Sequence, residues 1–430
     1  MRRFPLTPPH LALLPLLALV TAWLAPPARA QLMESAYPKD VPGFGTEAGV
    51  SVTSRIRQDT AWQQVPLGAE MLHPEVTQSL SYDSAILAGQ KPSWISATQP
   101  SLRLSSIDPA RGIAIGGVLS ADHEAYLAAP AQSYTNWTAA IGTTFGLADY
   151  TLTAAAAHLS LYQNDNTLDA AQYDTPLPYS VDLVRLGLET PPARLRLRPI
   201  FDLSRFTYGS TTIGGQPAPQ SYRDRLVSEL GMTVSFGIMG YDDPNRLQLV
   251  MLGAGAHYPN ESAGQPPRDF LGGTVLVGVE HDLDGIWGWR FALGAGGRAY
   301  SHGYQDQFVP LAEAAVTWQP SERTTVHFAL FRRIEDASSE GVGGYVATVG
   351  GVAVDHEINR HLILHLGTHL ERADYTDATN QTILSGRMGL LWLVSQTLRL
   401  NASVTLSNHQ GNAQTAYGED AFLLGITAGL

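Results

Sequence analysis

Polar and apolar side chains alternate along several stretches of this chain. Within residues 397–407, apolar side chains occupy the even positions and polar side chains the odd ones. Residues 361–371 largely repeat this pattern. Because successive side chains of a strand point to opposite faces, a period of two predicts β-strands with one apolar face. Each stretch also has the length of a tilted strand that crosses a membrane.

The same pattern predicts eighteen strands along the chain, with sixteen as the alternative count. The predicted strands start near Gly68, Pro100, Gly112, Tyr134, Tyr150, Ser180, Arg194, Tyr222, Arg246, Asp269, Trp289, Phe308, Thr324, Tyr345, His361, Thr382, Leu398 and Asp420.

The predicted connections alternate in length. Even-numbered strands end in short joints rich in Asp, Asn, Pro and Gly, at 108–111, 148–149, 191–193, 242–245, 282–285, 319–322, 356–359 and 395–396. Odd-numbered strands end in longer polar loops, at 163–179, 209–221, 259–268, 335–343 and 409–419. A soluble β-sandwich has no reason to sort its loops in this way, whereas bacterial outer-membrane barrels do. We therefore predict an all-β fold, a transmembrane antiparallel up-and-down β-barrel whose N- and C-termini are periplasmic.

The composition favours a barrel over a helical membrane protein. Hydrophobic residues make up 44% of the chain, yet no apolar run after the first 30 residues is long enough for a membrane helix. A closed barrel needs only alternating apolar residues. The absence of cysteine excludes a disulfide scaffold and a cysteine-ligated metal site, and the net charge of −12 argues against a nucleic-acid partner.

The two ends of the chain carry targeting signals. Arg2 and Arg3, the apolar run at 11–24 and a small-x-small site at 28–30 predict a signal peptide over residues 1–30, with an uncleaved anchor as the alternative. Residues 31–66 are expected to form a periplasmic N-terminal segment, and residues 67–430 the barrel. The last strand alternates up to the final residue and is similar to the signal read by the bacterial barrel-insertion machinery, although it ends in Leu rather than the usual Phe. Its apolar positions are Phe422, Leu424, Ile426, Ala428 and Leu430.

The first predicted strand and the residues before it resemble the opening of a family of outer-membrane β-barrel porins in α-proteobacteria. The resemblance covers residues 52–84 and rests on Arg55, Arg57, Gly68, Pro74 and the sequence Tyr82-Asp83-Ser84. The chain departs from the family pattern at Ser84, where Asp or Asn is expected. The resemblance implies an outer-membrane barrel, and some members of the family are linked to exopolysaccharide export.

Several arginines are predicted to face the lumen from neighbouring or nearby strands. They are Arg185, Arg194, Arg196, Arg198, Arg205 and Arg399. Opposed cations and carboxylates across a pore could form a constriction that selects polar or anionic solutes, sugars included. The alternative is a wall of mutually neutralising charges that only satisfies the polar interior.

Three histidines at intervals of four also fall on one strand face. On a helix, His361, His365 and His369 would suggest a metal site, but on a strand four residues span roughly 13 Å. We therefore expect separate lumen-facing polar residues, with no metal and no other cofactor.

These features predict a channel of the outer membrane. It would allow passive passage of polar solutes, or export a secreted polysaccharide together with periplasmic export components, and its surroundings would be outer-membrane lipids and lipopolysaccharide. One alternative is a lipid hydrolase that uses His327 or His409 with a neighbouring serine, although no enzyme site is evident. Another is a structural or adhesive barrel whose long loops bind a partner.

Overall fold

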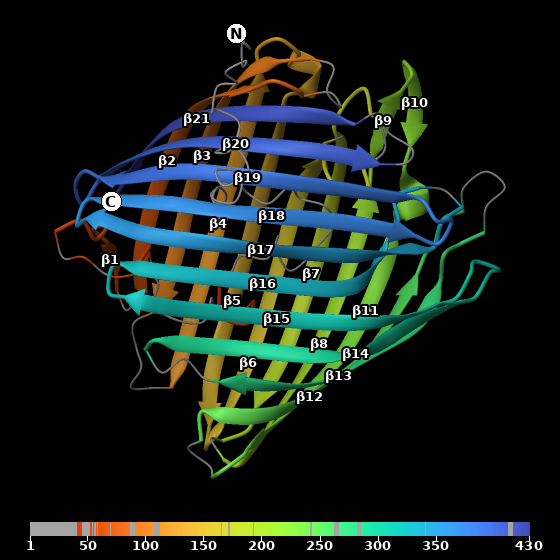
Figure 1. The fold of residues 1–430 in the computed structure, drawn as a ribbon, viewed down its shortest axis with the longest axis horizontal. Coiled ribbons are helices and arrows are strands. Elements are labelled where there is room, and N and C mark those ends of the chain that lie inside the picture. The colour runs from red at the N-terminus through yellow and green to blue at the C-terminus, as the bar shows by residue number, and fades with distance from the viewer. Residues whose placement is uncertain are drawn as a thin grey trace, which may run out of the picture.

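The computed structural model is a closed antiparallel β-barrel of eighteen strands. It describes residues 41–430 apart from 45–51, 54, 56, 58, 69, 87–90, 107–111, 165, 171–172, 192, 241–242, 262–265, 282–284, 340 and 412–415. Each barrel strand pairs with the next, and the first closes the ring by pairing with the last. Figure 1 shows two walls of the barrel, with the strands of the C-terminal third in front and β4 to β8 behind them. The predicted signal peptide lies outside the described residues.

The barrel strands are β2 (Glu70–Asp83), β3 (Ser93–Ser106), β4 (Ile113–Tyr126), β5 (Tyr134–Leu147), β6 (Tyr150–Gln163), β7 (Leu177–Glu189), β8 (Leu195–Tyr208), β11 (Arg225–Gly237), β12 (Asn245–His257), β13 (Phe270–His281), β14 (Trp287–Tyr300), β15 (Gln307–Ser321), β16 (Thr324–Asp336), β17 (Gly344–Asn359), β18 (Leu362–Tyr375), β19 (Asn380–Leu393), β20 (Leu398–Gly411) and β21 (Tyr417–Gly429). The short strand β1 (Val65–Leu67) pairs with β2, and β9 (Ser210–Ile213) pairs with β10 (Gln216–Pro219). Two 3-10 turns, η2 (Pro130–Gln132) and η3 (Ser221–Arg223), lie in loops. No helix among the described residues is long and apolar enough to cross a membrane.

The predicted fold class and strand count are confirmed. Every predicted start lies within three residues of an observed one except that of the second strand, which begins at Ser93 rather than near Pro100. Pro100 lies inside this strand, and the ladder between β3 and β4 omits Gln99 and Pro100. Proline has no N–H to donate to a ladder, so it looks like a strand boundary in the sequence even where the strand continues.

Two predicted joints are displaced for a related reason. β15 continues to Ser321, and its register with β16 shifts between Trp318 and Ser321, so that Pro320 lies in an irregularity rather than in the turn. β17 likewise continues to Asn359, with a shift beside Glu357. The turns themselves are at 322–323 and 360–361. Irregular positions in a strand carry the same residue types as turns, which explains the error.

The connections are asymmetric, as predicted. At one end, called the long-loop end, the connections are 84–92, 127–133, 164–176, 209–224, 258–269, 301–306, 337–343, 376–379 and 412–416. At the other, the short-turn end, they are 107–112, 148–149, 190–194, 238–244, 282–286, 322–323, 360–361 and 394–397. The asymmetry is strongest in the first half of the barrel. The predicted loop 409–419 is shorter than expected because β20 and β21 extend into it.

Side chains alternate between an outward apolar face and an inward face. On β7, Val184 and Leu186 are exposed, whereas Val181 and Leu183 are buried on the inner face. Exposed indoles lie near both ends of the barrel, with Trp94 and Trp137 near the long-loop end and Trp392 near the short-turn end. At the short-turn end the rings of Trp287 and Trp318 stack with centroids 5.1 Å apart. This is the arrangement of a barrel with a lipid-facing apolar wall and an aromatic belt.

Candidate functional site

Two segments of the chain lie inside the barrel and define the candidate site. The first is the loop 164–176, which follows β6. Leu168 of this loop is fully buried in a cluster with Tyr345, Ala347 and Ile383. These three residues belong to β17 and β19, on the side of the ring opposite β6. The loop therefore reaches across the lumen to the far wall.

Asp169 fastens this loop to the far wall. Its carboxylate accepts hydrogen bonds from the amide of Ser338 at 2.6 Å and from the hydroxyl of Tyr375 at 2.7 Å. Its own amide donates to Oε1 of Gln381 at 2.8 Å. Asp169 adopts a left-handed backbone conformation with φ of 59°, which Asp tolerates better than most residues. Burial raises the pKa of its carboxyl to about 6, against the opposing effect of the Tyr375 hydroxyl and of Arg223.

A group of buried arginines lies at the long-loop end of the lumen, and one of them contacts the docked loop. Arg223, only 1% exposed, donates to the hydroxyl of Tyr173 in the loop at 2.9 Å and to Gln163 at 3.1 Å. Arg225 and Arg298 share the carboxylate of Asp336, at 2.9 and 2.5 Å. One carboxylate thus joins β11, β14 and β16 on the inner face of the wall.

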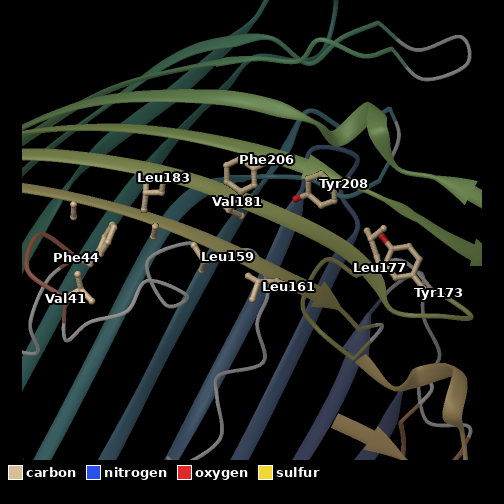
Figure 2. Close-up of a cluster of buried hydrophobic side chains, with 12 residues drawn as sticks. Val41, Phe44, Leu159, Leu161, Tyr173, Leu177, Val181, Leu183, Phe206 and Tyr208 are labelled. Atoms are coloured by element: carbon tan, nitrogen blue, oxygen red, sulfur yellow. The ribbon is translucent and has the colours of Figure 1, made fainter. Parts of the chain in front are cut away.

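The second inner segment is the N-terminal one, whose described residues contact two opposite walls. Val41 and Phe44 belong to a buried cluster with Leu159, Leu183 and Phe206 on β6, β7 and β8. Figure 2 shows both side chains against the strands of this wall.

On the far side, Val52 is buried with Ile363 and Leu393, at the short-turn end of β18 and β19. Arg57 forms an ion pair of 2.6 Å with Glu357 of β17. The N-terminal segment predicted for residues 31–66 is therefore, where it is described, a lumenal element.

Four of the predicted lumen arginines do face inward. Arg185 makes a two-pronged ion pair with Asp202, with both distances 2.7 Å. Arg198 contacts Glu280 at 3.4 Å, and Arg196 lies on the same inner face. The guanidinium of Arg399 lies 3.9 Å from the ring centroid of Trp62.

Two predictions of lumen-facing arginines are wrong. Arg205 is exposed on the outward face of β8, in register with Asp182 and Leu226, because it differs in parity from the inward Asp202. Arg194 precedes β8 and donates to backbone carbonyls at the short-turn end, the nearer being Gly237 at 3.1 Å.

The three histidines occupy separate environments. His361 lies in the turn 360–361, beside the carbonyl of Leu393 at 3.2 Å. His365 and His369 face inward on β18. Nδ1 of His365 is 2.5 Å from Asp355, and Nε2 of His369 is 2.8 Å from Glu371. Each inward histidine thus has its own carboxylate, and the strand spacing keeps the histidines apart as expected.

The two histidines considered for hydrolysis have other partners. Nδ1 of His327 is 3.3 Å from the Thr317 hydroxyl, and His409 pairs with Glu419 at 2.9 Å. In the part of the chain that the structure describes, neither makes the serine contact that the hydrolase hypothesis requires. The C-terminal strand does alternate as predicted, with Phe422, Leu424 and Ile426 exposed on its outward face.

Sequence reasoning missed the lumenal position of both inner segments. The loop 164–176 and the residues before β1 look like ordinary polar connections apart from a few apolar side chains. Apolar residues such as Leu168 in a loop, or Phe44 before the barrel, are the signal that could have indicated packing inside the lumen, where the structure buries both.

Two solved structures that are similar to this chain are those of the outer membrane protein OpdK and of OccAB2. OpdK from Pseudomonas aeruginosa is 10% identical, with a TM-score of 0.45, covering 84% of this chain and 99% of that one. OccAB2 from Acinetobacter baumannii is 9% identical, with a TM-score of 0.46, covering 85% of this chain and 99% of that one. Among curated proteins, none matches this chain.

A family model matches the barrel from its first short strand to its last, over residues 65–429. This match and the closed eighteen-strand fold establish an outer-membrane β-barrel channel for solutes. The chain belongs to the porin family described as "Putative beta-barrel porin 2".

Proposed function

We propose that this channel allows small polar solutes to diffuse passively and does not pass a polymer chain. The observation that carries the proposal is the pair of segments inside the lumen. The loop 164–176 docks on β17 to β19 near the long-loop end, and the N-terminal residues contact β16 to β19 near the short-turn end. An eighteen-strand barrel alone is wide enough for an aqueous lumen, and both segments narrow it.

The charges on the wall support a pore that is largely neutralised. Arg185 and Arg290 each pair with a carboxylate of a neighbouring strand, and Arg198 pairs with Glu280, which lies further round the wall on β13. Such pairs satisfy a polar interior without creating a strong field of one sign. At these positions the wall is better described as neutral and hydrated than as a constriction of opposed charges.

The orientation of the barrel is part of the proposal. We place the short-turn end and both termini in the periplasm and the long-loop end outside the cell. The outward alternation of β21 supports its role as the signal for the insertion machinery. Outward arginines near the long-loop end, such as Arg205 and Arg372, suit contact with phosphate groups of lipopolysaccharide.

Swelling of liposomes that contain the purified protein tests the size limit. Monosaccharides and small organic acids should enter and cause swelling, whereas oligosaccharides of increasing length should enter progressively more slowly. Rapid permeation of long polysaccharide chains through the unmodified protein would support the export function instead. A protein that inserts and never conducts, even without the loop 164–176, would contradict both versions of the channel.

A further inference from the structure

Arg387 differs from the paired arginines of the lumen wall. It lies near the middle of β19, on the inward face, and is 5% exposed. Its Nη2 donates to the hydroxyl of Ser403 at 2.8 Å. Within the part of the chain that the structure describes, Nε and Nη1 have no hydrogen-bond partner and no carboxylate forms an ion pair with this guanidinium. Arg185, by contrast, donates to both carboxylate oxygens of Asp202.

The strand register places Arg387 beside a row of small and polar residues. Arg387 is opposite Gly367 on one side and Thr405 on the other. Its hydrogen bond to Ser403 directs the guanidinium toward the next row, in which His365, Gly389 and Ser403 are aligned. Residues diagonal to one another on neighbouring strands are about 7–8 Å apart, a distance that an arginine side chain spans.

His365 supplies a second buried polar atom to the same row. It is 2% exposed, and its Nδ1 is held by Asp355 at 2.5 Å. Its Nε2 has no hydrogen-bond partner among the described residues. Asp355 thus holds the His365 ring through Nδ1. The free Nε2 of the ring lies on the inward face of the sheet, as Arg387 does. Gly389, which separates His365 from Ser403, places no side chain between them.

The position along the channel axis is also informative. On the inward face of β19, Ile383 packs against the loop 164–176 and Leu393 packs against Val52 of the N-terminal segment. Arg387 lies between these two contacts. A solute that passes either inner segment therefore meets this arginine on the wall between them.

A buried cation without a counter-ion is unfavourable, because its lost hydration is not replaced. We propose that Arg387, Ser403 and His365 form an anion-binding subsite that takes the carboxylate or phosphate group of a small solute in transit. An oxyanion provides the acceptors that the free guanidinium donors lack. This inference rests on the proposed passage of small solutes and specifies which of them the pore retains.

Calorimetric titration of the full protein in detergent tests the subsite apart from conduction. Sodium phosphate and sodium benzoate serve as the two probes and distinguish a phosphate from a carboxylate preference. At least one probe should bind saturably, and Arg387→Gln should weaken its affinity by about tenfold or more, the usual range for a hydrogen bond to a charged group. Ser403→Ala, which removes only the orienting hydroxyl, should cause a smaller loss.

Arg205→Gln is the matched control, because it removes the same charge from the outward face of the barrel. The affinity of this variant for the probe should equal that of the unmodified protein. Heat-modifiable migration in gels shows whether each variant is folded. Equal binding by Arg387→Gln, or no binding of either probe by the unmodified protein, overturns the subsite. Saturable binding in detergent without any conductance overturns the channel and leaves the subsite standing.

Discussion

The carboxylate of Asp169 accepts a hydrogen bond of 2.6 Å from the amide of Ser338, and these two residues come from loops on opposite sides of the barrel. The hydroxyl of Ser338 also donates to the carbonyl of Asp169. This reciprocal contact holds the loop 164–176 across the lumen. We expect the strength of this contact to determine how often the loop leaves the far wall, and therefore the width of the pore.

The Asp169–Ser338 contact can be locked covalently. The chain has no cysteine, so the double variant Asp169→Cys/Ser338→Cys introduces the only thiols. We expect a disulfide to form under oxidising conditions, because the two residues touch in the docked state. In planar bilayers, current fluctuations should be reduced in the oxidised protein and restored by a reductant. Failure of the two thiols to react would mean that the loop does not dock at Ser338.

The pH dependence of docking follows from the raised pKa of Asp169. Burial raises this pKa to about 6, whereas an exposed aspartate has a pKa of about 4. The docked loop therefore binds the proton more tightly than the free loop. Docking is favoured below about pH 4 and weakens as the pH rises through about 6.

Single-channel recordings between pH 4 and pH 8 measure this effect. Mean conductance should rise with pH through about 6 in the unmodified protein. Asp169→Asn keeps a side chain that tolerates the left-handed backbone and cannot titrate, so its conductance should lack this step. An identical step in Asp169→Asn would assign the titration to another group.

Asp336 is expected to be the most important single carboxylate for stability. It pairs with both Arg225 and Arg298, and all three side chains are largely buried. Asp336→Ala leaves two buried cations without this partner and should reduce the free energy of unfolding by about 3–5 kcal/mol. Denaturant unfolding followed by tryptophan fluorescence measures the loss.

Asp374→Ala is a suitable comparison, because Asp374 also contacts two arginines but is more exposed. Its effect should stay below about 1 kcal/mol. Equal effects of the two substitutions would show that the burial of the Asp336 cluster adds no stability.

The N-terminal segment should detach when its ion pair is reversed. Arg57 and Glu357 are 2.6 Å apart and mostly buried, so Arg57→Glu places two carboxylates together. Proteinase K should then cleave the segment at least about tenfold faster, because local opening controls cleavage. The double variant Arg57→Glu/Glu357→Arg restores the attraction and should restore protection. If it does not, the ion pair does not hold the segment.

The strands could be predicted from the sequence because the alternation of apolar and polar side chains is a local property of each strand. Leu398, Leu400 and Leu406 share the outward face of β20 whatever the rest of the chain does. The lumen-facing prediction failed at Arg205 because this residue differs in parity from Arg196 and Arg198 on the same strand. An arginine near the end of a strand can extend toward the headgroup region and is therefore tolerated on the outward face.

The inner segments could not be predicted in the same way. Asp169 is bound by Ser338, Tyr375 and Gln381, all more than 160 residues further along the chain. The sequence of the loop itself does not indicate which distant residues it contacts. Arg387 was overlooked for a similar reason, since only the strand register shows that Gly367, Gly389 and Ser403 lie beside it. Among the described residues, no carboxylate forms an ion pair with it.

The most direct test of the account is the single-channel conductance of the protein with and without its inner segments. Replacing residues 164–176 by a short turn and removing residues 31–63 should produce a stable barrel with a several-fold larger conductance and permeation by long oligosaccharides. A conductance equal to that of the unmodified protein would contradict the claim that these two segments set the width of the pore.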